Sequence, residues 1–302
     1  MDRLIKAKVE QGRVAIHWLG QGGFAFKAHA GDIIMVDPYL SDSANADGGA
    51  ARLVDVPVRP RDVVLNYLFL THDHIDHTDP HSAPLIAQAN PDALVICPQS
   101  SARLMTKWGV PQSRIQTAMP GQAIEFPNFT AHVVTAHHSE DSVGYVFEFN
   151  EEGSSSSGPV VYITGDTEYS DTLAHNVEEY GPDVLLVPIN GRWGNMTAQQ
   201  AARLTAEIEP AEVIPMHYGM FEANTADPND FLGLLSTELP SDTATKAVVM
   251  KHNTSHTYCP AETAGGRQVA KKNRIAKANA ARKGHEHHDG VRGPAPTGSR
   301  GH

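Results

Sequence analysis

The 302-residue chain has only two cysteines and no long apolar segment. Cys97 and Cys259 are too few for a disulfide framework and lack the CxxC spacing of a zinc knuckle, so we interpret them as buried or incidental thiols. No run approaches the roughly 18 to 20 apolar residues that a membrane helix needs. The N-terminal stretch MDRLIKAKVEQGR lacks the apolar region of a signal peptide. These absences predict a soluble cytoplasmic protein with no membrane partner.

Positive charge is scarce outside the C-terminal segment. The formal net charge is -11, yet residues 265–302 hold nine Lys or Arg against two acids, which leaves -18 for the rest. An acidic body argues against nucleic-acid binding by the folded part, because it repels phosphates. We expect one folded domain over residues 1–264. Residues 265–302 are expected to form a basic, disordered tail, the one part suited to nucleic acid.

The order of apolar runs predicts an α/β fold. Strands are expected at 14–20, 22–28, 32–38, 66–70, 93–97, 129–136, 142–149, 160–164, 183–189, 212–217 and 246–250. Helices are expected at 80–91, 100–109, 171–180, 197–208 and 227–239. Two sheets packed face to face, with helices outside, would satisfy this order. The segment 151–159 is expected to be a flexible hairpin loop, and the polar loop 39–62 is long enough to overhang a site.

Three histidines and three aspartates crowd the stretch LFLTHDHIDHTDP, directly after an apolar run. His72 and His74 are two residues apart, so in an extended segment both imidazoles project to one side and can bind one cation. Asp76 and His77 face neighbouring space if the chain turns there. Imidazole and carboxylate without thiolate favour an open, catalytic site for zinc, manganese or iron. Two adjacent cations would need further ligands, including a shared anionic oxygen.

Further candidate ligands follow other predicted strands. His137 and His138 come after strand 129–136, Asp166 after strand 160–164, and His217 at the end of strand 212–217. A rigid sheet would hold such groups at one rim. His17, inside a strand, is interpreted instead as a hydrogen-bonded structural residue.

The sequence resembles the metallo-β-lactamase superfamily. THDHIDH matches its H-x-H-x-D-H signature, and WLGQGGFAFK, IIMVDP, TGDT and PMHYG follow the order of its other conserved elements over about residues 13–260. The resemblance implies the αββα four-layer sandwich. It also implies a first metal on His72, His74 and His137 or His138, with His138 favoured. The same resemblance puts a second metal on Asp76, His77 and His217, with Asp166 bridging.

The resemblance implies a hydrolase that uses two divalent metal ions, zinc or manganese with iron possible, and a hydroxide held between them. Asp76 would orient the hydroxide and pass its proton to the leaving group. The chain has no GxSxG nucleophile elbow. The segments KWGVP, MPGQ, INGRWGNMT and IPMHYGMF are similar to L-ascorbate-6-phosphate lactonases, which implies a small anionic substrate, a phosphorylated sugar lactone.

Three alternatives stay open at this point. One is a phosphodiesterase of the N-acyl phosphatidylethanolamine phospholipase D type, and the second is a non-catalytic metal-binding protein. A redox di-iron protein is the third, and His74 counts against it because related flavo-di-iron proteins have Glu there. Arg192, in the loop INGRWGN, is a candidate substrate-binding residue for a phosphate or carboxylate, against a structural ion pair. The oligomeric state is not predicted.

Overall fold

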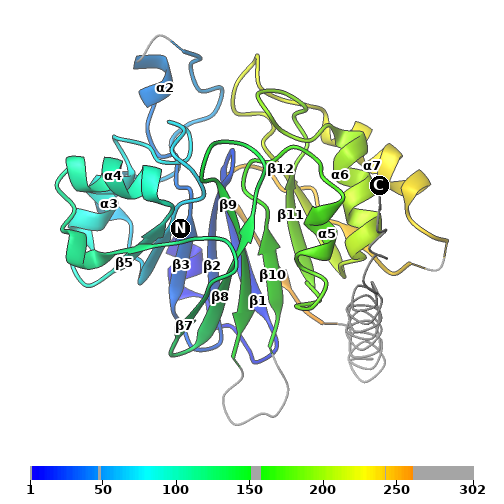
Figure 1. Ribbon diagram of the computed structural model, residues 1–302, viewed down its shortest axis with the longest axis horizontal. Helices are drawn as coiled ribbons and strands as arrows, with labels where there is room; N and C mark the ends of the chain where they lie inside the picture. The colour runs from blue at the N-terminus through cyan, green and yellow to red at the C-terminus, as the bar shows by residue number, and fades with distance from the viewer. Residues whose placement is uncertain (1, 47–48, 151–157, 242, 261–302) are drawn as a thin grey trace, which may run out of the picture.

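The computed structural model describes residues 2–46, 49–150, 158–241 and 243–260, and these form two seven-stranded sheets packed face to face (Figure 1). The first sheet has the order β14-β1-β2-β3-β4-β5-β6 and the second the order β13-β12-β11-β10-β9-β8-β7. The first comprises β1 Val14–Gly20, β2 Gly23–Ala28, β3 Ile33–Val36, β4 Tyr67–Phe69, β5 Leu94–Cys97, β6 Ile115–Thr117 and β14 Thr254–Tyr258. The second comprises β7 Ala123–Phe126, β8 Phe129–Thr135, β9 Val143–Phe149, β10 Val160–Ile163, β11 Val184–Pro188, β12 Glu212–Met216 and β13 Lys246–Ala247.

Helices cover the outer face of each sheet (Figure 1). On the first sheet lie α3 Ala83–Ala89 and α4 Gln99–Lys107, and on the second α5 Thr172–His175, α6 Ala198–Ile208 and α7 Pro228–Glu238. The short helices are α1 Asp2–Lys6, α2 Ser43–Ala46, η1 Pro60–Asp62 and η2 Gln112–Arg114. Helix α6 begins at a capping box, in which Thr197 and Gln200 satisfy each other's backbone N–H groups. The expected αββα sandwich is confirmed.

Alternating side chains on the strands build two apolar layers. In β3, Ile34 and Val36 face the core between the sheets, whereas Ile33 and Met35 face α3 and α4. The period of two residues in a strand produces this division. The central layer is rich in aromatic rings; for example, the Phe69 and Phe147 rings meet edge to face with centroids 4.9 Å apart. The described residues contain no helix long and apolar enough to cross a membrane.

The strands that precede the candidate ligands all end at one rim. Strand β1 is antiparallel to β2, and β2 to β3, while β3 and β4 are parallel, so β1, β3 and β4 run in one direction. In the second sheet β8, β10, β11 and β12 share a direction by the same reasoning. Carboxyl ends of parallel strands are where open α/β sheets bind ligands. The fold therefore brings loops from both sheets to one edge.

The structure departs from the sequence expectation at several elements. The helix expected over 171–180 is only α5, because the next turns bond i to i+3, as from Val177 N to Ala174 O. The strand expected over 246–250 is only two residues long. Strands β6, β7 and β14 were not expected; β14 is a polar edge strand and lacks an apolar period. The expected loop at 151–159 falls mostly on 151–157, and the tail at 265–302 wholly, outside the described residues.

Candidate metal centre

A tight turn arranges the ligands of the THDHIDH segment. The backbone N–H groups of His77 and Thr78 both donate to the His74 carbonyl, at 3.0 and 2.8 Å. The Thr78 hydroxyl donates to the His72 carbonyl at 2.6 Å. The sequence suggested an extended segment through His74. The chain instead bends at Asp73 and then turns. The bend still brings the two histidines together and lets Asp76 and His77 face a second position.

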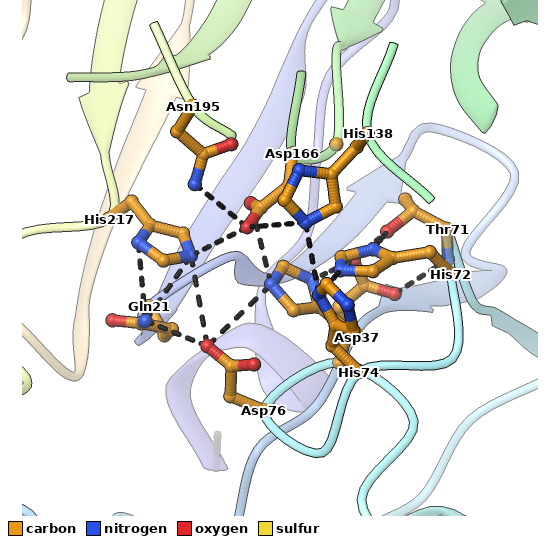
Figure 2. A network of polar contacts seen from close by, with 12 residues as sticks. Gln21, Asp37, Thr71, His72, His74, Asp76, His138, Asp166, Asn195 and His217 are labelled. Atoms are coloured by element: carbon orange, nitrogen blue, oxygen red, sulfur yellow. Dashed lines mark hydrogen bonds and ion pairs between the residues drawn. The ribbon is translucent and has the colours of Figure 1, made fainter. Parts of the chain in front are cut away.

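Three imidazoles converge in a first cluster, formed by His72, His74 and His138 (Figure 2). Nδ1 of His74 lies 3.1 Å from Nε2 of His72 and 3.0 Å from Nε2 of His138. Nitrogens bound to one cation at ~2.0 to 2.1 Å lie roughly 2.9 to 3.4 Å apart, depending on whether the geometry is octahedral or tetrahedral. The cluster therefore has the dimensions of a cation site.

Hydrogen bonds set the tautomers that a cation requires. His138 Nδ1 lies 2.9 Å from the Gly194 carbonyl, which can only accept, so the proton is on Nδ1 and Nε2 has a free lone pair. Thr71 donates its hydroxyl to Asp37 at 2.5 Å, so its oxygen accepts from Nδ1 of His72, 2.9 Å away. Burial, together with the nearby imidazole of His77, keeps the pKa of His72 well below its usual value. Neutral imidazole is the form that binds metal.

The structure separates the two adjacent histidines left open by the sequence. His138 lies in the first cluster, whereas the exposed His137 has its Nε2 3.3 Å from the Thr172 hydroxyl. The backbone N–H of His137 donates to Thr167 at 2.9 Å, which fixes the turn in this orientation. The placement favours His138 as the ligand.

A second cluster consists of Asp76, His77 and His217. Figure 2 shows Asp166 between His138 of the first cluster and His217 and Asp76 of the second. Asp76 Oδ2 is 3.8 Å from Nε2 of both histidines. Asp166 Oδ2 is 3.1 Å from His217 Nε2 and 3.8 Å from His138 Nε2, so this one oxygen reaches toward both clusters. This is the position that a bridging carboxylate needs.

Two buried atoms at the second cluster lack hydrogen-bond partners: Nε2 of His77, a member of the cluster, and Oδ1 of the adjacent Asp166, 3.4 Å away. Burial alone would lower the pKa of His77, but the carboxylates around it hold that pKa well above its usual value. Burial alone would raise the pKa of Asp166, but His217 and His77 hold it well below its usual value. Unsatisfied polar atoms are rare in protein interiors, and a cation bound between these atoms would satisfy both.

Asp37 supports both clusters, although sequence reasoning missed it. The carboxylate is fully buried and accepts from Thr71 N at 2.8 Å, from the Thr71 hydroxyl and from His77 Nδ1 at 2.7 Å. It therefore fixes the proton of His77 on Nδ1 and leaves Nε2 facing the second cluster. Asp37 follows β3 directly, in a left-handed conformation with φ of 45°. A polar residue immediately after an apolar strand is the sequence signal that points to it.

Gln21 and Asn195 were also missed. Gln21 Nε2 donates to Asp76 Oδ2 at 2.9 Å, and the backbone carbonyl of Gln21 accepts from the Trp18 indole at 3.0 Å. Asn195 Nδ2 donates to Asp166 Oδ2 at 2.8 Å. Both residues lie in turns after strands and hold carboxylates in place. A neutral amide in a turn has no distinctive sequence signal.

A pocket of about 340 Å³ opens onto the clusters. His74, Asp76, His138 and Asp166 line it on the side of the clusters. Six further lining residues form what we call the apolar wall: Ala44, Ala50, Ile75, Trp193, Phe221 and Ala223. Asn224 completes the lining, so the described residues around the pocket include no Lys or Arg. The segment expected as a loop over 39–62 contains the short helices α2 and η1; it contributes Ala44, in α2, and Ala50 to the lining, whereas Tyr39 itself is buried.

The structure brings seven of the eight predicted site residues together and leaves Arg192 apart. Arg192 is exposed and is not a lining residue, whereas its neighbour Trp193 is one. Its role in binding substrate therefore stays a prediction. His17 is a hydrogen-bonded residue as expected, with Nδ1 2.8 Å from the Ser255 hydroxyl. Cys97 is buried and Cys259 exposed, and neither forms a disulfide.

Comparisons with known proteins agree with this architecture. A family model described as a beta-lactamase superfamily domain matches residues 33–218. The UPF0173 metal-dependent hydrolase of Herpetosiphon aurantiacus is 32% identical over 230 residues, covering 70% of this chain and 86% of that protein. Its counterpart in Archaeoglobus fulgidus is 30% identical over 222 residues, covering 72% and 88%. Igni18, a metallo hydrolase from Ignicoccus hospitalis, superposes with a TM-score of 0.66 at 23% identity, covering 82% of this chain and 99% of Igni18, and so supports the fold. The chain therefore belongs to the metallo-β-lactamase superfamily, as a metal-dependent hydrolase of the UPF0173 family.

Proposed function

We propose that this metal-dependent hydrolase cleaves a carboxylic ester bond, in a lactone foremost, with two divalent cations. His72, His74 and His138 would hold the first cation, Asp76, His77 and His217 the second, and Asp166 both. The observation that carries the proposal is the position of Asp166 Oδ2, which reaches toward both clusters beside the pocket. The nitrogen and oxygen donor set suits zinc, manganese or iron.

The cations, when bound, lower the pKa of water toward neutrality and stabilise negative charge on the attacked group. Asp76 lines the pocket and is partly exposed, so its carboxylate can accept a proton from the attacking water and pass it to the leaving oxygen. Gln21 holds Asp76 Oδ2 in a fixed orientation during this exchange. Asn195 does the same for Asp166.

The lining beyond the clusters supports a substrate whose remaining part is neutral. The two cations would compensate the charge of a reacting phosphate as well as that of an attacked carbonyl, but a second charged group would meet no Lys or Arg in the described lining. The phosphorylated sugar lactone suggested by the resemblance, L-ascorbate 6-phosphate, would have to direct its phosphate beyond the lining toward Arg192. No specific observation favours the phosphodiesterase or the non-catalytic alternative.

The test is turnover by protein loaded with manganese or zinc. Substrates are γ-butyrolactone, γ-nonalactone, L-ascorbate 6-phosphate and bis(p-nitrophenyl) phosphate, with Asp76→Ala as the control. We expect lactone hydrolysis that falls ~10²- to 10⁴-fold in the variant, the usual contribution of a proton-transfer group. Turnover of the phosphodiester alone would contradict the proposal. Lactone turnover unaffected by Asp76→Ala would remove the role given to that residue.

A further inference from the structure

We propose that the pocket selects an uncharged substrate with a hydrocarbon substituent, and that Trp193 is the residue that recognises this substituent. The inference rests on the proposed ester or lactone hydrolysis and names its substrate class: neutral alkyl lactones or esters. The apolar wall would receive the hydrocarbon, and the reacting carbonyl would face the two clusters.

The pocket is lined mainly by apolar residues. Six of the eleven lining residues form the apolar wall, and the only charged or titratable groups are the four candidate ligands. An anionic substituent held against the apolar wall, away from the two clusters, would find no lining side chain to neutralise it, and the chain as a whole is acidic. Burying an unpaired charge is costly, whereas burying hydrocarbon is favourable. The lining therefore discriminates in favour of a neutral, apolar group.

Arg52 lies in the segment that supplies part of the apolar wall, but its guanidinium is bound to backbone carbonyls and an aromatic ring. Its guanidinium donates to backbone carbonyls, including Tyr39 O at 2.7 Å and Val54 O at 3.1 Å, and lies 5.0 Å from the centre of the Tyr39 ring. Nearby, Leu53 N donates to Met220 O at 2.8 Å, which ties this loop to the segment that carries Phe221. Arg52 therefore holds the loop beside the wall and is not among the residues that line the pocket.

Trp193 is held at the pocket rim in an unusual conformation. Its φ is 56°, a left-handed value that costs a bulky residue energy, and its side chain is 75% exposed. Gly191 and Gly194 flank it, also with positive φ. The Gly194 carbonyl binds His138, and a Cβ at Gly194 would lie only 2.9 Å from Nδ1 of that ring.

The turn thus anchors an exposed indole to a candidate metal ligand. Such a side chain gains apolar contact when a substrate covers it, and it has few rotatable bonds to immobilise. The adjacent Arg192 is exposed outside the lining. Recognition by Trp193 requires an apolar substituent on the substrate, whereas recognition by Arg192 would require an anionic one.

The test compares γ-lactones of increasing alkyl length, from γ-butyrolactone to γ-nonalactone, with L-ascorbate 6-phosphate. We expect kcat/KM to rise about two- to fourfold per methylene until the pocket is filled. Trp193→Ala should raise KM for γ-nonalactone about tenfold, a larger factor than for γ-butyrolactone, and Trp193→Phe should restore most of the loss. Met119→Ala, which removes an exposed apolar side chain outside the lining, is the matched control.

A flat dependence on chain length would overturn the inference. So would faster turnover of L-ascorbate 6-phosphate that depends on Arg192. If no lactone is hydrolysed, the apolar site can be tested apart from the reaction, by measuring the binding of an alkyl-substituted γ-lactam to metal-loaded protein by calorimetry. Binding weakened by Trp193→Ala would then support the apolar site although the proposed reaction fails, and absent binding would refute the site itself.

Discussion

Replacing Asp37 by Asn should weaken the second proposed metal site, which contains His77, more than the first, which Asp37 reaches only through Thr71. The Asp37 carboxylate accepts three hydrogen bonds with its two oxygens: Oδ1 from Thr71 N, and Oδ2 from the Thr71 hydroxyl and His77 Nδ1. Asn has only one oxygen. If its amide nitrogen takes the Oδ2 position, it faces a second donor at His77 Nδ1. The imidazole must then move its proton to Nε2, the atom that faces the second cluster.

The size of the effect follows from the change in His77. A protonated Nε2 cannot bind a cation, and the loss of the buried carboxylate also makes the ring a weaker base. Partners that orient a metal-bound histidine typically contribute 10- to 100-fold in affinity, or about 1.4 to 2.7 kcal/mol. The opposite orientation of the amide would instead place its nitrogen against Thr71 N–H, two buried donors facing each other, which is also unfavourable.

The assay is a titration of metal-free protein against a chromophoric competitor, which reports the affinity of each bound equivalent. We expect two equivalents in the native protein and one weakened 10- to 100-fold in Asp37→Asn. Asp141→Asn is the matched control, because Asp141 accepts from the backbone N–H and hydroxyl of Ser100 but contacts no histidine of the clusters. Equal affinities in the native protein and Asp37→Asn, within threefold, would refute the reasoning.

Four further changes test other parts of the structure. Gln21→Leu removes the amide that orients the candidate proton acceptor, so kcat/KM should fall roughly 10- to 100-fold with metal content retained, measured by kinetics and elemental analysis. Gly22→Ala places a Cβ 2.6 Å from Cε1 of His77, so it should lower Tm and metal content. In Gly233→Ala, within α7, the new Cβ meets nothing within 4 Å, so the free energy of unfolding should rise by about 0.5 to 1 kcal/mol. Burial lowers the pKa of His17 to about 4 from 6.5, so its contribution to stability is present above pH 6.5 and is lost as pH falls toward 4; chemical denaturation should show the difference from His17→Gln shrinking from pH 7 to pH 5. Chelation should lower Tm, and added metal should restore it in a concentration-dependent way.

The sequence predicted the ligand set better than its local geometry. Three ligand candidates come at most three residues after the end of a strand: His72, Asp166 and His217. The ordered backbone of the sheet therefore largely fixes where they lie. His138 could not be separated from His137 by that logic, because the choice depends on a turn bonded to Thr167 and Gly194.

The pocket itself was the least predictable part. Arg192 and Trp193 are adjacent, and the sequence favoured the charged residue as the one that binds substrate. The structure places only the indole in the lining, because left-handed φ values at 191, 193 and 194 set the direction of each side chain. Such values depend on contacts across the rim, which local sequence does not specify. The same holds for Ala50, since the nearby Arg52 is held by bonds to the carbonyls of Tyr39 and Ser41 that the local sequence does not specify.

The two clusters draw their members from both sheets, and this has a consequence for the whole fold. His72, His74, Asp76 and His77 follow β4 of the first sheet, whereas His138, Asp166 and His217 follow strands of the second. Each cluster therefore contains at least one residue from each sheet, and Asp166 reaches toward both. A cation in either cluster would cross-link the sheets at the rim, where the apolar layer between them ends. Metal binding and the packing of the two sheets are thus coupled, because the ligand atoms converge only when the sheets are correctly docked. A THDHIDH segment on one sheet alone would supply two of the three members of each cluster and no bridging carboxylate, which is why the motif gains its chemistry only within the complete sandwich.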